Sequence, residues 1–231
     1  MAANNRLWGA ERIRGELLKL GIRVSKRTIQ KYIEPTRKRP RGQNWATFID
    51  NHRAEVWSCD FLQLVDVRFA PIFAFFIMEL DRRRMVHVGV TREPSPEWVT
   101  QQRRSATSSG ASPRFLIRDR DAKFGRDFDR GAELTGIKIV TTAVRAPNMN
   151  AECEPFLGSV RRECLDHVLV LGEHQLLRIL REYVGYHNDL RPHQGIGQGV
   201  PTRAANTGSP CGPVASSPVR GGLHHSYRRA A

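Results

Sequence analysis

Three apolar runs of β-forming residues follow one another closely between Glu55 and Thr91, and this succession constrains the fold more than any other feature. They are "EVWSCDFLQLVDV" (55–67), "FAPIFAFFIMELD" (69–81) and "RMVHVGVT" (84–91), and the last two are joined at "RRR". Runs of this length and composition, separated by so few residues, predict strands, with a hairpin between the second and third.

Downstream, the pattern alternates between strands and helices. Residues 96–106 predict a helix, and "RFLIRD" (114–119) and "GIKIVTTAV" (136–144) predict strands. Two further helices are expected from about Glu154 to 169 and over 173–188, the second with Leu176, Ile179, Leu180 and Tyr183 on one face. The sequence therefore predicts an α/β domain, in which a mixed five-stranded sheet is packed against helices.

The first forty-two residues carry a concentrated positive charge. Twelve Lys and Arg residues face three Glu residues there, a net +9. Two short helices are predicted: Ile13, Leu17 and Leu20 share the apolar side of the first, and Gly21 ends it. The second begins after an N-cap at Ser25, with Val24 and Ile29 as a hydrophobic staple, and closes at Glu34-Pro35.

This arrangement predicts a helix-turn-helix over residues 1–35, followed by a basic linker over 36–49. The second helix presents a polar side that can reach DNA phosphates or base edges, formed by Lys26, Arg27, Gln30 and Lys31. A helical hairpin with a solvated charged face is the alternative.

The net charge of +14 lies at the two ends of the chain, because residues 198–231 add +4 and the middle is left near neutrality. Basic ends around a neutral core suit a polyanion held by flanking modules, although a solubility device is the alternative. No apolar run of 18 residues and no signal peptide appears, so a cytoplasmic protein with reduced thiols and no membrane partner is expected.

Three carboxylates occupy notable positions in the predicted core. Asp60 lies on the first strand, Asp119 ends the fourth, and Glu154 opens a helix with Pro155 at its first position. If strands one and four are neighbours and the helix end faces them, these carboxylates converge and repel, which Mg²⁺ or Mn²⁺ would relieve. Strand-end and helix-cap acids without a metal are the alternative.

The motifs around these residues resemble those of the integrase/transposase superfamily, which includes retroviral integrases and catalytic subunits of bacterial insertion sequences. "CDF" around Asp60 resembles the first-aspartate strand, and "RDRDAKFG" around Asp119 resembles the second. "RAPNMNAECEPFLGSVRRECLDH" resembles the glutamate segment, and "YHNDLRPHQGIG" with Pro201 resembles the segment that ends the domain. The interval of 34 residues between Asp119 and Glu154 is close to the family's spacing.

The resemblance implies an RNase H-like catalytic core over residues 50–201, in which Asp60, Asp119 and Glu154 bind two divalent ions. It implies DNA integration or transposition by cutting and joining phosphodiesters, with double-stranded DNA (element ends and target) as substrate and a homo-oligomer on DNA. Asp121 and Glu152 are the competing acids. The candidate DNA contacts of the core are Arg118, Arg120, Lys123, Arg161 and Arg162.

Some features depart from the family pattern or are open to another interpretation. Val99 is the only large aliphatic residue of "VTQQRRSATSSGASP", so that helix is expected to cover its sheet face poorly, and the chain begins almost at the helix-turn-helix. An inactive DNA-binding remnant and an RNase H-type nuclease are therefore the alternative functions. Cys164 and His167 lack the further ligands of a zinc site, and His193 suits DNA, Glu154 or a structural turn. Residues 202–231 are treated as a basic tail.

Overall fold

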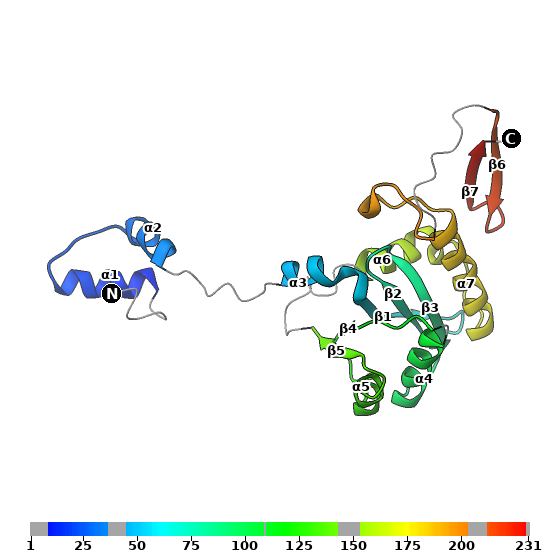
Figure 1. Ribbon diagram of the computed structural model, residues 1–231, viewed down its shortest axis with the longest axis horizontal. Coiled ribbons are helices and arrows are strands. Elements are labelled where there is room, and N and C mark those ends of the chain that lie inside the picture. Colours follow the sequence, from blue (N-terminus) through cyan, green and yellow to red (C-terminus); the bar gives the residue numbers. More distant parts are fainter. Residues whose placement is uncertain (1–8, 37–44, 109, 143–152, 203–211, 230–231) are drawn as a thin grey trace. The chain divides into compact units, whose positions relative to one another are not determined.

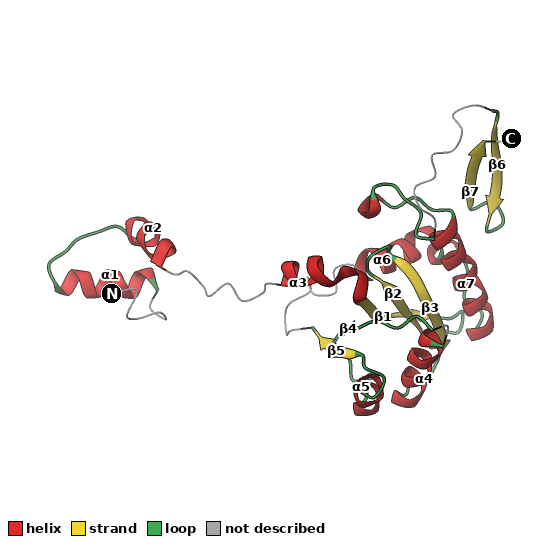
Figure 2. Ribbon diagram, viewed as in Figure 1, coloured by secondary structure: helices red, strands yellow, loops and turns green. Residues whose placement is uncertain are grey.

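The chain divides into two compact units, Met1–Asp50 and Asn51–Ala231. The structure is a computed structural model, and it describes residues 9–36, 45–108, 110–142, 153–202 and 212–229. Helices and strands are labelled in Figure 1 and distinguished by colour in Figure 2.

The first unit contains α1 (Ala10–Lys19) and α2 (Lys26–Thr36). Ile13 and Ile29 are buried against each other, with Val24 packed beside them, so the staple is confirmed. The Ser25 hydroxyl accepts a hydrogen bond from the backbone N–H of Thr28 at 3.0 Å, as an N-cap does. The prediction for Leu20 is wrong, because it lies beyond the last turn of α1 and is 64% exposed.

Two predicted boundaries in this region are also wrong. Helix α2 ends at Thr36, one residue beyond Pro35. Residues 36–49, expected to be a linker, contain most of α3 (Trp45–His52), and a 3₁₀ turn (Arg53–Glu55) leads from α3 into the first strand. Helix α3 extends past residue 50, the predicted start of the core. Its sequence "WATFIDNH" has Trp45, Phe48 and Ile49 at helical spacing, which favours a short helix there.

The second unit is built on a five-stranded sheet in the order β3-β2-β1-β4-β5. Strands β1 (Val56–Val65), β2 (Pro71–Glu79) and β3 (Arg84–Thr91) are antiparallel neighbours. Strands β4 (Phe115–Arg118) and β5 (Lys138–Thr141) run parallel to β1. The predicted mixed sheet is confirmed, and so is the adjacency of the first and fourth strands on which the convergence of the acids depends.

Helices cover both faces of this sheet, as Figure 1 shows. One face packs against α6 (Cys153–Glu163) and α7 (Glu173–Asp189), which bury Phe156, Val160, Leu176, Leu180 and Tyr183. Helix α6 ends at Glu163 and gives way to a 3₁₀ turn (Leu165–His167), so it is shorter than predicted. Helix α7 is followed by a further 3₁₀ turn (Gln194–Ile196).

The opposite face packs against α4 (Pro96–Thr107) and α5 (Arg126–Glu133). The expectation of poor cover is wrong. Helix α4 buries Val99 and Ala106, and α5, which the sequence analysis did not predict, adds Phe128 and Ala132. Phe124 fills the space between them, so aromatic residues from the segment after β4 supply the apolar area that α4 lacks.

The C-terminal region is not only a tail. Residues Val214–Val219 (β6) and His224–Arg229 (β7) form an antiparallel hairpin, separate from the main sheet. None of the helices in the described part of the chain is long and apolar enough to cross a membrane.

Candidate active site

The register of the two central strands brings Asp60 and Asp119 together. Strand β1 pairs with β4 in parallel, with Val56 opposite Phe115 and Ser58 opposite Ile117. Continuing this register by two residues places Asp60 opposite Asp119, directly after the last residue of β4. Opposite residues of neighbouring parallel strands lie about 4.8 Å apart and point to the same face of the sheet. The two carboxylates are therefore neighbours.

Helix α6 brings Glu154 to the same face. Glu154 lies in the first turn of this helix and is exposed, whereas Cys153, Phe156 and Val160 anchor the helix in the core. The ring of Phe156 meets that of Phe76 on β2 at a centroid distance of 5.2 Å. The alternation of side chains along β1 turns Asp60 toward this α6 face, because Leu62 faces α6 while Cys59 and Phe61 face α4 and α5.

The pKa shifts of these acids reflect their proximity. The pKa of Asp60 is raised to about 7. Burial is the main cause, the Phe61 N–H lowers the pKa, and the nearby charges of Asp119, Glu154 and Asp121 also raise it. That N–H donates to Asp60 Oδ1 at 2.7 Å. Burial also raises the pKa of Asp119, again with Asp121 contributing. Neighbouring carboxylates repel each other when both are ionised, and a bound cation relieves this repulsion.

The donor set fits a hard divalent cation. All three candidate ligands are carboxylates, and oxygen donors are the ligands that Mg²⁺ and Mn²⁺ prefer. Among the residues that the structure describes, no three His, Cys, Asp or Glu side chains already stand in a metal-binding arrangement. Asp60 and Asp119 thus form a pre-assembled pair, and Glu154 adds its charge from α6.

The competing acid Asp121 is occupied in the turn after β4. Its backbone N–H donates to Asp119 Oδ1 at 3.1 Å, and its carboxylate pairs with Lys123 Nζ at 2.5 Å. It also accepts from the Lys123 backbone N–H at 3.0 Å. Asp121 therefore shapes the turn and helps to orient Asp119. Glu152, the other competitor, lies outside the described residues.

The fold of this core is that of retroviral integrase catalytic cores. The magnesium complex of the HTLV-2 integrase catalytic core domain (trimeric form) aligns with a TM-score of 0.51, 12% identity, and coverage of 64% of this chain and 93% of that one. The simian T-cell lymphotropic virus intasome, solved with the PP2A regulatory subunit B56 gamma, aligns with a TM-score of 0.52 and 9% identity. That alignment covers 88% of this chain and 77% of the other.

Two sequence comparisons agree with this fold. A family model described as "Integrase core domain" matches residues 135–201. The "Insertion element IS476 uncharacterized 39.2 kDa protein" of Xanthomonas euvesicatoria is 25% identical over 169 residues, which are 73% of this chain and 49% of that protein. In sequence, the chain is thus similar to this integrase core domain family and to an insertion-element protein. It spans about half the length of this curated relative.

The family match covers only part of the integrase core. Its span begins before β5 and runs through α6 and α7, so it contains Glu154 but neither Asp60 nor Asp119. The two aspartates are joined to that span by the sheet, since β4 lies between β1 and β5.

Arg118 does not have the predicted role in this core. Its guanidinium donates to both Asp129 oxygens, at 2.9 and 2.6 Å, and to the backbone carbonyl of Asp119 at 2.8 Å. The side chain is only 10% exposed, so it is not open to a phosphate. Arg118 instead ties α5 to the turn that carries Asp119, a role that its sequence position cannot reveal because Asp129 lies eleven residues away.

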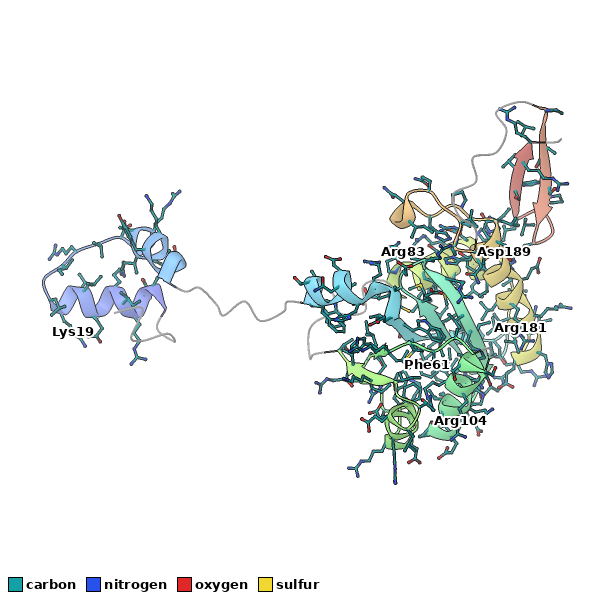
Figure 3. The ribbon with its side chains drawn as sticks, viewed as in Figure 1. Lys19, Phe61, Arg83, Arg104, Arg181 and Asp189 are labelled. Carbon is teal, nitrogen blue, oxygen red and sulfur yellow. The ribbon has the colours of Figure 1, made fainter. Side chains whose placement is uncertain are left out.

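The other predicted DNA contacts lie at or near the surface. Lys123 is partly covered, with its Nζ 5.3 Å from the Phe61 ring centroid (Phe61 is labelled in Figure 3). Arg120 donates to the Thr142 carbonyl at 2.9 Å and Arg161 to the Gln63 carbonyl at 2.9 Å. The exposed side chains of the set are Lys26, Arg27, Gln30, Lys31, Arg120, Arg161 and Arg162.

The histidines near the end of the core have structural positions. His193 is buried, and its Nε2 donates to the His187 carbonyl at 2.9 Å, which fits the structural turn among the alternatives considered. His187 is buried as well, and burial lowers its pKa to about 3. His167 lies against the Arg162 carbonyl at 2.9 Å.

Proposed function

We propose that this protein is an integrase-type catalytic subunit that cuts and joins DNA phosphodiesters in DNA integration or transposition. The observation that carries the proposal is the pairing of Asp60 with Asp119 across the parallel strands, with Glu154 close enough to raise the pKa of Asp60. An acid pair at adjacent strand positions, one of them largely buried, is costly without a cation and suits a site that holds one.

In this proposal Asp60, Asp119 and Glu154 hold two Mg²⁺ or Mn²⁺ ions. When bound, such ions activate water or a DNA 3′-hydroxyl and stabilise the leaving oxygen of an in-line displacement. The chain's own residues prepare the site: the Asp121 N–H and the link from Arg118 to the Asp119 carbonyl fix the turn. Lys123 and Arg120 lie beside it as positive charges for the DNA backbone.

The remaining parts of the chain have supporting roles. Residues 1–35 act as a helix-turn-helix that binds double-stranded DNA through the exposed polar side of α2, and residues 50–201 carry catalysis. The substrates are the element ends and the target, bound by a homo-oligomer at the nucleoid. Among the structural relatives, one was solved as an intasome and another in a trimeric form.

The test uses the full chain with Mn²⁺ and labelled duplexes that contain the ends of its own element. Wild type should give nicked and joined products, and Asp119→Asn should give neither. Nicking without joining would replace the proposal with an RNase H-type nuclease. Binding without any cleavage, in a folded protein, would replace it with a DNA-binding remnant.

A further inference from the structure

Residues 186–195 ("YHNDLRPHQG") run from the end of α7 into the turn that follows it, and they contain none of the proposed metal ligands. The Asn188 side chain bonds both backbone groups of Met85 on β3, accepting from its N–H at 2.9 Å and donating to its carbonyl at 2.8 Å. His187 Nε2 donates at 3.1 Å to the carbonyl of Arg83, just before β3 (Arg83 is labelled in Figure 3). Because β3 is an edge strand, the segment is fastened to one edge of the sheet.

The same segment holds the C-terminal end of α6. Arg191 donates to both carboxylate oxygens of Glu163, the last residue of this helix, from Nε at 3.0 Å and from Nη2 at 2.6 Å. The buried Tyr183 of α7 donates its hydroxyl to Glu163 Oε2 at 3.0 Å. His193 Nδ1 accepts from Arg191 Nη1 at 3.2 Å. Two parallel bonds from a planar guanidinium fix the direction of the partner as well as its distance.

A ring contact holds the other end of α6, beside Glu154. Phe156 meets the ring of His187 edge-on, with the centroids 4.9 Å apart and the planes at 85°. Since burial lowers the pKa of His187 to about 3, this ring is neutral and packs as an uncharged group. The His187 ring is in turn backed by that of His193, at 4.2 Å. Arg191 therefore supports both ends of α6, directly at its last residue and through the two histidines at its first turn.

The direction of α6 decides where Glu154 stands relative to Asp60 and Asp119. Glu154 and Glu163 are nine residues apart, which is about 13.5 Å along an α-helix. If the packing beside Glu154 loosened, a tilt of about 10° about the Glu163 end would move Glu154 by about 2 Å, the length of a whole Mg²⁺–oxygen bond. Because Mg²⁺ demands near-ideal ligand geometry, a displacement of this size would weaken its binding.

We propose that Arg191 and His187 are positioning residues, which hold α6 in the direction that brings Glu154 to the other two acids of the proposed metal site. The inference rests on the proposed function, because that function makes these acids the metal ligands. Both residues act through the helix, at its opposite ends. Contacts that orient metal ligands in this way typically contribute about 10–100-fold to metal affinity.

The test compares full-length variants that each lose one ion pair of the core. Arg191→Gln removes the link to Glu163. The matched control, Arg92→Gln, removes the link to Asp66, and both pairs have a closest N–O distance of 2.6 Å. Asp66 follows β1 and Arg92 follows β3, so this control pair does not include α6. The readouts are the dissociation constant for Mn²⁺, from the electron paramagnetic resonance of the free ion, and the free energy of unfolding in urea with EDTA.

Both variants should be less stable than wild type, because each leaves a carboxylate without its arginine. Only Arg191→Gln should also bind Mn²⁺ about tenfold more weakly. Arg92→Gln should stay within about twofold of wild type. Arg191→Lys keeps the charge but not the two parallel bonds, so its Mn²⁺ affinity should lie between those of wild type and Arg191→Gln. If Arg191→Gln does not fold, Arg191→Lys takes its place in the comparison.

His187→Ala tests the other end of α6. It should weaken Mn²⁺ binding by at least as much as Arg191→Gln, because the ring contact that it removes lies beside Glu154. Its unfolding curve verifies that the variant is folded at the temperature of the Mn²⁺ titration.

An unchanged Mn²⁺ affinity in folded Arg191→Gln and His187→Ala would overturn the inference, because residues 186–195 would then stabilise the fold without positioning Glu154. An equal loss of Mn²⁺ affinity in Arg92→Gln would also overturn it, because the loss would then follow from lower stability alone. If wild type binds Mn²⁺ in these cases, the proposed metal site stands. If wild type binds no Mn²⁺, the metal site of the proposed function fails and the inference fails with it.

Discussion

Among the candidate metal ligands, Asp60 has the most strongly shifted pKa, and the shift is caused by its immediate surroundings. The β1 position buries the carboxyl and the fold sets Asp119, Glu154 and Asp121 near it, whereas the Phe61 N–H favours its charged form. The folded-state pKa of about 7 lies above the ordinary value of 3.8. The folded protein therefore holds more protons than the unfolded chain between these values, and its free energy of unfolding falls as the pH rises through that window.

We expect Asp60→Asn to stabilise the metal-free protein at pH 8 by about 2 kcal/mol, because it removes a buried charge and keeps the acceptor for the Phe61 N–H. At pH 4 the gain should largely vanish, since Asp60 is then protonated. Urea unfolding in EDTA at both pH values measures this, with the exposed Asp81→Asn as the control. A variant that is less stable than wild type at pH 8 would contradict the assigned environment.

The elements that the sequence predicted are those with a long apolar pattern. All five strands of the sheet, α4 and α7 were predicted in nearly their observed positions, because their sequences carry apolar or β-branched residues in the matching pattern. Helix α5 was missed, because "RDFDRGAE" is mostly charged and buries only Phe128 and Ala132. The hairpin was missed because its strands are polar and Pro218 stands inside β6, which argues against a strand.

The candidate site, like the fold, was predictable from the sequence only in part. Motif and spacing singled out Asp60, Asp119 and Glu154, which the structure brings near one another, but the partners of the basic residues depend on tertiary contacts. Arg118 follows a strand and looks available for phosphate, yet the unpredicted helix α5 supplies Asp129 as its partner. The assignment of Arg118 was wrong, and the cover of the sheet was underestimated, because helix α5 was not predicted.

The cover of the α4 face can be tested through α5. Phe128 is fully buried against Phe124, with ring centroids 5.1 Å apart, so Phe128→Ala should cost about 3–4 kcal/mol of unfolding free energy. The control is Leu134→Ala at the end of the same helix, because Leu134 is 81% exposed. Urea unfolding should show no more than about 0.5 kcal/mol for that variant. Similar small losses in both would mean that α5 does not complete the core.

Most of the net positive charge lies at the two ends of the chain, whereas the candidate catalytic acids lie in the core. The near-neutral core carries the acids, and the basic ends carry an N-terminal helix pair and a C-terminal hairpin. Because DNA affinity is governed largely by phosphate neutralisation, we expect the ends to control binding and its salt dependence, and the core to control the reaction.

In the N-terminal unit, Arg27→Gln with Lys31→Gln should weaken duplex binding by about tenfold and reduce the salt slope by about 1.5–2, since both side chains lie exposed on α2. The matched control is Arg14→Gln with Lys19→Gln on α1, where each cation is already paired with a glutamate, at 3.1 and 2.9 Å. Anisotropy titrations compare the two. Indistinguishable slopes would contradict recognition through α2.

The proposed metal site is tested most directly by the rise in melting temperature on adding Mn²⁺, measured for wild type and single variants of the acids. Asp60→Asn, Asp119→Asn and Glu154→Gln should each lose most of the wild-type rise, because each removes a proposed ligand. Asp121→Asn and Glu152→Gln should largely keep it. An equal response in all five variants would contradict the site formed by β1, β4 and α6.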